Sequence, residues 1–97
     1  MTQPEARFSR KVIKLLEKIP ETYVIRTQAG SIVGIPDLLI CHKGRFYAWE
    51  LKVGDNTATA IQLHELAKIR MAGGSALVVR PGTLDLAIKI MLEGKLS

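Results

Sequence analysis

GIPDLLICHKGRFYAWELK, residues 34–52, contains two apolar runs separated by residues 43–44, and this pattern predicts a β-hairpin. If the hairpin loop has an even number of residues, two or four, the strand register places Asp37 directly opposite Glu50. Their Cβ atoms would then be about 4.5–5.5 Å apart. Because side chains alternate along a strand, Lys52 lies on the same face as Glu50. The hairpin therefore predicts three ionisable side chains at one end of a sheet.

Helix and strand patterns continue on both sides of this hairpin. We expect a helix at about 4–19, a strand at 22–27, a helix at about 58–71, a strand at 75–80 and a helix at 84–92. A helix between the third and fourth strands fits a right-handed crossover joining parallel strands, whereas the first three strands form an antiparallel meander. The sequence predicts a single α/β domain over residues 1–97, in the order αβββαβα, with a mixed sheet flanked by helices on both faces.

The three ionisable residues occur where a hydrophobic interior is expected, since the third strand is apolar enough to be buried on both faces. Two neighbouring carboxylates, Asp37 and Glu50, repel each other unless a cation neutralises them. Oxygen ligands without His or Cys favour Mg²⁺, with Mn²⁺ as a substitute. Lys52 beside the metal would orient or deprotonate a water, which favours metal-assisted phosphodiester hydrolysis. The alternative is that Asp37 begins a strand and Glu50 forms a surface ion pair with Lys52.

Two further polar residues fall on the apolar stripes of helices. Gln62 lies at the centre of the stripe of the second helix, where its amide needs a partner such as an active-site water, a metal ligand or a phosphate. Glu5 lies on the stripe of the first helix, one turn before Phe8. Each has a structural alternative: Gln62 as a core amide bonded to backbone, and Glu5 as a favourable carboxylate in a first helical turn.

The combination of Pro36-Asp37, Glu50-Leu51-Lys52 and Gln62 resembles the PD-(D/E)XK nuclease pattern. The αβββαβ order resembles the restriction-endonuclease-like core of that superfamily, to which a C-terminal helix would be added. The sequence is most similar to the stand-alone VRR-NUC domains of phages and bacteria, which are similar in turn to Holliday-junction resolvases. The similarity spans about residues 5–92. One departure lies in residues 53–60, which lack the Ser-Pro or similar helix start that the pattern leads us to expect.

The resemblance implies a Mg²⁺-dependent, structure-selective endodeoxyribonuclease that acts on branched DNA such as Holliday junctions. It implies Asp37 and Glu50 as metal ligands with the Leu51 carbonyl as a third, and Lys52 as the residue that positions the water. Gln62 and Glu5 match the remaining catalytic positions. Stand-alone members form homodimers whose two sites cut symmetric branched DNA, and a dimer would also enlarge the DNA-contact area of so small a domain.

The charge balance agrees with a nucleic-acid partner, because 14 basic against 9 acidic residues give a net charge of +5. A group of polar residues flanks the loop before Pro36 and is expected to contact DNA phosphates, with ordinary loop polarity as the alternative: Arg26, Thr27, Gln28 and Ser31. Two competing functions are a non-catalytic DNA-binding or scaffolding module and a site-specific restriction endonuclease. The latter is disfavoured because 97 residues leave little room for elements that read bases.

No secretion signal or membrane-spanning run is recognisable, and the sequence has one cysteine, which favours a cytoplasmic protein of a bacterium or a phage-infected cell. Cys41 lies within an apolar run and is predicted to be buried. His42, at the hairpin turn, is predicted to lie on the surface.

Overall fold

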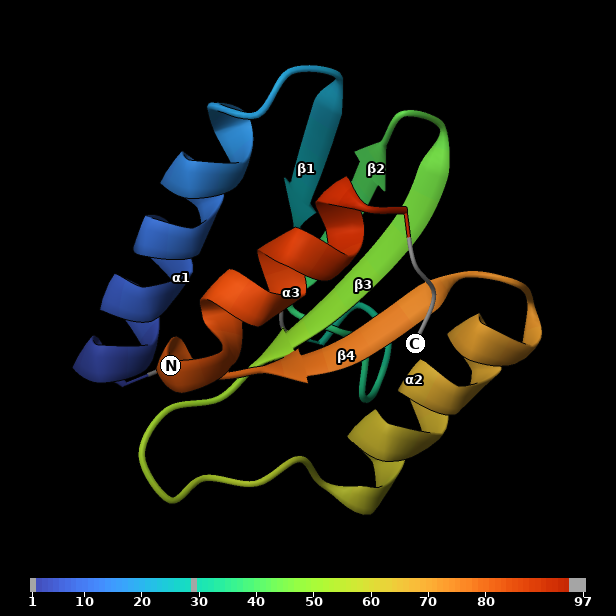
Figure 1. Cartoon of the computed structure of the whole chain (residues 1–97). Coiled ribbons are helices and arrows are strands. Elements are labelled where there is room, and N and C mark those ends of the chain that lie inside the picture. The colour runs from blue at the N-terminus through green and yellow to red at the C-terminus, as the bar shows by residue number, and fades with distance from the viewer. Residues whose placement is uncertain (1, 29, 95–97) are drawn as a thin grey trace.

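The computed structural model describes residues 2–28 and 30–94 and contains a mixed β-sheet with helices on both faces (Figure 1). Its elements are α1 (Gln3–Glu17), β1 (Thr22–Arg26), β2 (Leu38–His42), β3 (Arg45–Leu51), α2 (Ala60–Met71), β4 (Ser75–Val79), a 3₁₀ turn (Pro81–Thr83) and α3 (Leu84–Leu92). The predicted order is confirmed, although several elements are one or two residues shorter than predicted. None of the described helices is long and apolar enough to cross a membrane.

The sheet has the strand order β1-β2-β3-β4, antiparallel except for the parallel pair of β3 and β4. Residues 43–44 form the two-residue hairpin loop, and both have positive φ, as a type I′ turn requires. The predicted register is confirmed, and the last pair of the β2–β3 ladder is Leu38 with Trp49. Asp37 and Glu50 lie one step beyond this pair, at the end of the sheet opposite the hairpin turn.

Helices α1 and α3 cover one face of the sheet, and α2 packs on the other face, mainly against β3 and β4. The larger core lies beneath α1 and α3 and contains Phe8, Val12, Leu16, Leu38, Ile40, Tyr47, Trp49, Leu51, Val79, Leu84, Ala87 and Met91. The smaller core beneath α2 contains Ala48, Leu66 and Ala76. Most of β3 is therefore buried on both faces, as its apolar sequence predicts.

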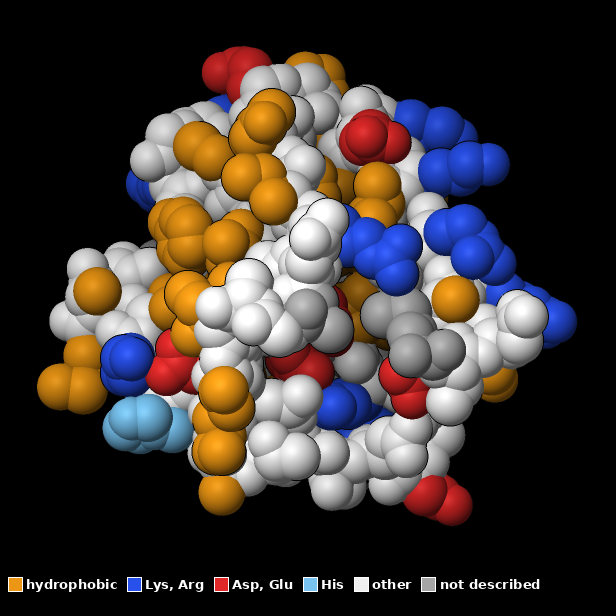
Figure 2. All heavy atoms as spheres, turned by 180° about the vertical axis from the view of Figure 1, so that it is seen from behind, with side chains coloured by type: hydrophobic (Ala, Val, Ile, Leu, Met, Phe, Trp, Pro, Cys, Tyr) orange, Lys and Arg blue, Asp and Glu red, His pale blue; other side chains and the backbone are white. Residues whose placement is uncertain are grey.

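Two sequence predictions about β2 are wrong. Cys41 is exposed, because α2 packs over β3 and β4 and leaves this face open near β1, where Tyr23 is also exposed. Hydrophobic side chains gather on this side of the molecule (Figure 2). His42 points to the opposite face, where it is 3% exposed and its Nδ1 lies 2.8 Å from the Thr22 hydroxyl. Burial lowers the pKa of His42, with a smaller contribution from the positive charge of Lys43.

Candidate active site

Asp37 bridges β2 and β3 at the open end of the hairpin, opposite the turn. Its carboxylate Oδ2 accepts a hydrogen bond from the amide of Leu51 at 2.8 Å. Its carbonyl accepts one from the amide of Thr27 at 2.9 Å, and the Thr27 hydroxyl donates to the carbonyl of Pro36 at 2.7 Å. The Asp37 side chain thus makes a further hydrogen bond to β3 beyond the last backbone pair of the β2–β3 ladder. Together with the bonds from Thr27, it holds the start of β2 against both β1 and β3.

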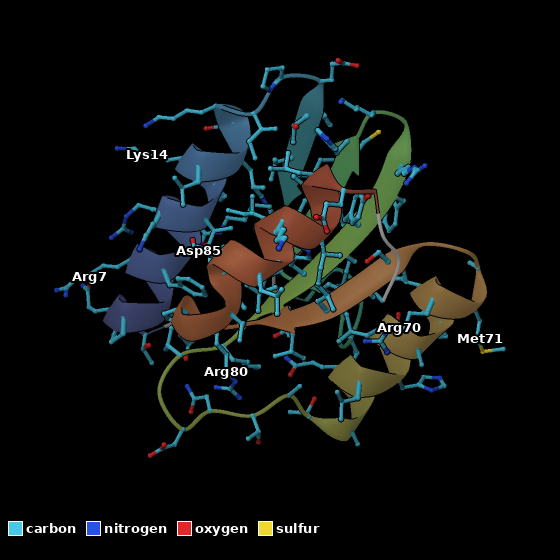
Figure 3. The ribbon with its side chains drawn as sticks, in the orientation of Figure 1. Arg7, Lys14, Arg70, Met71, Arg80 and Asp85 are labelled. Carbon is cyan, nitrogen blue, oxygen red and sulfur yellow. The ribbon has the colours of Figure 1, made fainter. Side chains whose placement is uncertain are left out.

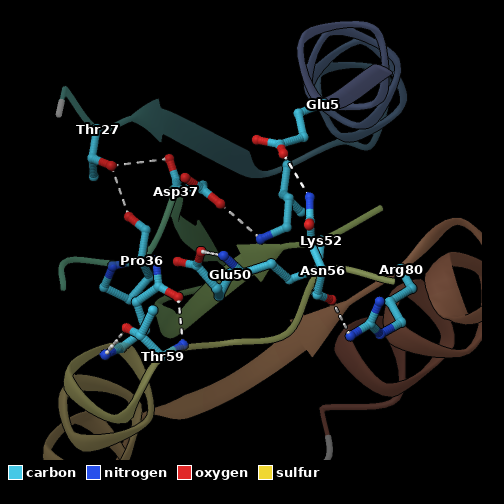
Figure 4. A network of polar contacts seen from close by, with 11 residues as sticks. Glu5, Thr27, Pro36, Asp37, Glu50, Lys52, Asn56, Thr59 and Arg80 are labelled. Atoms are coloured by element: carbon cyan, nitrogen blue, oxygen red, sulfur yellow. Dashed lines mark hydrogen bonds and ion pairs between the residues drawn. The ribbon is translucent and has the colours of Figure 1, made fainter. Parts of the chain in front are cut away.

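Glu50 is buried, with 2% of its surface exposed, on the face of β3 that α2 covers. Its Oε2 forms an ion pair with Lys52 Nζ at 3.2 Å (Figure 4). Its Oε1 is also buried and has no hydrogen-bond partner among the described residues. An unpaired buried carboxylate oxygen is costly, so this atom has capacity for a ligand.

Electrostatics set Glu50 apart from an ordinary glutamate. Burial raises the pKa of Glu50, and the negative charge of Asp37 raises it further, whereas Lys52 lowers it. The net result is a pKa of about 7, compared with 4.5 for the free side chain. The alternative in which Glu50 and Lys52 form a surface ion pair is therefore wrong, because both side chains are largely removed from solvent.

These residues fit a divalent cation. A cation would satisfy Glu50 Oε1 and neutralise the repulsion between Glu50 and Asp37. Among residues 2–28 and 30–94, no three His, Cys, Asp or Glu side chains are grouped as a metal site. The side-chain ligands would therefore be two carboxylates, those of Asp37 and Glu50. One or two carboxylates completed by waters and phosphate are typical of Mg²⁺. The amide of Leu51 is used by Asp37, and its carbonyl as a third ligand stays a prediction.

Gln62 has a local structural role that the sequence prediction missed. Its side-chain Oε1 accepts a hydrogen bond from the backbone N–H of Thr59 at 2.9 Å, and its backbone N–H donates to the Thr59 hydroxyl at 3.2 Å. This capping box begins α2 at Ala60, two residues later than predicted. The Thr-x-x-Gln spacing was the signal that could have located it. The side-chain oxygen is therefore bonded to backbone, as the structural alternative predicted, but Gln62 is half-buried at the start of α2 and is not part of the core.

A cavity of about 450 Å³ connects several predicted site residues, and it is lined by Arg26, Thr27, Gln28, Gly30, Ile32, Val33, Gly34, Ile35, Asp37 and Gln62. Gln62 and Asp37 are thereby brought to one cavity. Ser31, predicted with this group, is not part of the lining, and its hydroxyl donates to the Gln28 carbonyl at 2.9 Å. The loop between β1 and β2 forms most of the wall.

Replacement of Gly34 is expected to displace this wall. Gly34 has φ +80°, and an added Cβ would lie 2.4 Å from Ile61 Cγ2 and 2.9 Å from the Ile61 carbonyl oxygen. Gly34→Ala should therefore lower the free energy of unfolding by roughly 3 kcal/mol, measured by urea denaturation. Gly44→Ala is the matched control, since Gly44 also has φ +80° but open space around it. Equal losses in the two variants would contradict the role of the Ile61 contact.

Glu5 is half-buried in the first turn of α1, and its Oε1 accepts from Asn56 Nδ2 at 2.9 Å. Asn56 belongs to the loop that follows β3, and its carbonyl accepts from Arg80 Nη2 at 2.6 Å. The structure thus links Glu5 to the segment that directly follows Lys52. Neither Asn56 nor Arg80 was singled out from the sequence, because no spacing rule joins residues that meet only through tertiary folding.

Comparison with solved structures identifies the fold. One, described as a VRR_NUC domain, superposes with a TM-score of 0.77 at 23% identity, over 91% of this chain and 97% of its own. Another, described as a VRR_NUC domain protein, gives 0.73 at 18% identity, over 96% and 88%. The chain has the VRR-NUC fold. Hjc of Archaeoglobus fulgidus, a Holliday junction resolvase, gives 0.58 at 23% identity, over 77% of this chain and 67% of Hjc.

The VRR-NUC fold confirms the predicted restriction-endonuclease-like core, with α3 as the added C-terminal helix. No protein-family model and no curated protein matches the sequence. The similarity to these solved structures is therefore one of fold.

Proposed function

We propose that this protein is a Mg²⁺-dependent endonuclease that hydrolyses phosphodiester bonds in branched DNA such as four-way junctions. The observation that carries the proposal is Glu50 Oε1, buried without a partner beside Asp37, with Lys52 Nζ 3.2 Å from the other oxygen of Glu50. The VRR-NUC fold and the similarity to Hjc, a Holliday junction resolvase, support this assignment.

Asp37 and Glu50 would hold the cation, together with the Leu51 carbonyl. A bound Mg²⁺ supplies charge neutralisation at the phosphate and a more acidic water. Lys52, whose Nζ lies 3.2 Å from Glu50 Oε2, would hydrogen-bond the attacking water and neutralise charge on a phosphate oxygen. Attack of the water oxygen on phosphorus forms one P–O bond and breaks one ester P–O bond, which cuts one strand. Gln62, in the wall of the adjoining cavity, would contact the substrate with its amide group.

Basic and polar residues support a nucleic-acid substrate. Arg26 and Gln28 line the cavity beside Asp37, where they would bind phosphates next to the scissile bond. On α1, Arg7 and Lys14 point away from the sheet (Figure 3), and the net charge is +5. These side chains would bind the duplex arms of a junction. Two copies of the chain would place two sites on a symmetric junction, and sedimentation should give a homodimer.

Cleavage of a labelled four-way junction, compared with linear duplex of the same sequence, tests the proposal. We expect cutting with Mg²⁺ or Mn²⁺, no cutting with EDTA, and faster cutting of the junction. Tight junction binding without cutting in either metal would favour a non-catalytic DNA-binding module. Equal rates on junction and duplex would contradict the selectivity for branched DNA.

A further inference from the structure

The loop between β3 and α2 is tied to two distant parts of the chain. Arg80, which follows β4, donates from Nη1 to the Gly54 carbonyl at 3.2 Å and from Nη2 to the Asn56 carbonyl at 2.6 Å. The Asn56 side chain donates to Glu5 on α1 at 2.9 Å. Figure 4 shows this chain of contacts from Glu5 through Asn56 to Arg80.

Hydrogen bonds from backbone amides hold both the start of this loop and Arg80 in place. The amide of Lys52, the first residue after β3, donates to the carbonyl of Val79, the last residue of β4, at 3.1 Å. The start of the loop is therefore bonded to the residue that directly precedes Arg80. The amide of Arg80 donates to the Thr83 hydroxyl at 3.0 Å. Figure 3 places Arg80 beside the start of α3, next to this loop. A planar guanidinium can bind two carbonyls at once, which the single ammonium of a lysine does poorly.

We propose that Arg80 and Asn56 are positioning residues, which hold the Glu5 carboxylate at the catalytic end of the sheet. Arg80 fixes the loop through its carbonyls, and the loop then presents the Asn56 amide to Glu5. This inference rests on the proposed nuclease function and assigns a role to two residues outside its catalytic set. Glu5 has three rotatable side-chain bonds, so a fixed hydrogen bond removes conformations in which its carboxylate lies away from the site.

Asn56 can be tested without disturbing the loop. Asn56→Ala keeps the carbonyl that Arg80 binds and removes only the bond to Glu5. We expect single-turnover cleavage of the junction to slow about tenfold, with the Kd for junction DNA unchanged. In a Glu5→Ala background, Asn56→Ala should have no further effect, because it acts through Glu5. Thr57→Ala, an exposed neutral change in the same loop, is the matched control.

Arg80 is tested through the loop itself. Arg80→Ala should slow cleavage to a similar extent and increase amide hydrogen exchange in residues 54–58. Arg80→Lys keeps the charge and should recover only part of the rate, since one of the two carbonyl bonds is lost. Lys89→Ala removes a positive charge from the exposed side of α3 and controls for net charge.

Each outcome decides the inference. An additive effect of Asn56→Ala and Glu5→Ala, a normal rate for either Asn56→Ala or Glu5→Ala, or unchanged loop exchange in Arg80→Ala would overturn it. If the wild-type protein cuts no DNA, the nuclease function fails and the positioning role in catalysis fails with it. Hydrogen exchange in Arg80→Ala and the side-chain amide NMR signal of Asn56, compared between the wild type and Glu5→Ala, would still show whether Arg80 and Asn56 hold Glu5.

Discussion

Lys52→Ala should lower the rate of junction cleavage by a factor of about a thousand or more, while the fold and DNA binding are retained. Lys52 Nζ is the cation next to Glu50, and the Lys52 side chain is 15% exposed, so no solvent ion replaces it with the same geometry. The backbone bond from Lys52 to Val79 does not depend on the side chain. Single-turnover cleavage and a gel-shift titration, carried out on the same junction, separate the chemical step from binding.

Lys68→Ala is the matched control for this experiment. Lys68 also forms an ion pair, 3.0 Å from Glu65, but on the exposed side of α2. Its removal should change cleavage by less than about twofold, since a surface ion pair contributes little. A Lys52→Ala rate within about tenfold of the wild type would contradict the assigned role, and thermal unfolding of both variants checks that the fold is intact.

The metal-free protein should lose stability as the pH rises from about 4.5 to 7, because of Glu50. In the folded protein the pKa of Glu50 is raised to about 7 by burial and by Asp37. In this window the folded state holds a proton that the unfolded state has released, so the free energy of unfolding falls with pH. A shift of this size corresponds to roughly 3 kcal/mol, which is lost in full above pH 7.

Urea denaturation in EDTA across this pH range measures the effect, with Glu50→Gln as the comparison. The variant keeps the size of the side chain but cannot ionise, so its stability should depend less on pH and should exceed that of the wild type at pH 8. It should also lose cleavage. Added Mg²⁺ should stabilise the wild type at pH 8 and leave Glu50→Gln nearly unaffected. Parallel pH profiles for the two proteins would refute the assigned pKa.

The sequence was sufficient for the hairpin and for the trio built on it. Residues 43–44 determine the turn and hence the register, and alternation along β3 then places Glu50 and Lys52 on one face. These are local relations, which depend on spacing alone. The trio therefore could be predicted, and the structure adds the burial, the unpaired oxygen and the ion-pair distance.

Predictions failed where the outcome depends on which element covers which surface. Cys41 and His42 are adjacent in β2, so their side chains lie on opposite faces of the sheet. The alternation of side chains along the strand does not tell which of these faces a helix covers at this point. Only the position of α2 over β3 and β4 decides this. Gln62 was placed on the correct helix, but the capping bond with Thr59 depends on a start that was predicted two residues too early.

The hydrogen bond from the Leu51 amide to Asp37 joins two residues that are close in the chain, and it lies at the open end of a single hairpin. Contacts of short sequence separation require little loop closure and form early on a folding pathway. We therefore expect Asp37, Glu50 and Lys52 to come together in the transition state for folding, before α2 and α3 dock. Conservative substitutions in this hairpin should then slow refolding, whereas those in α3 should mainly speed unfolding.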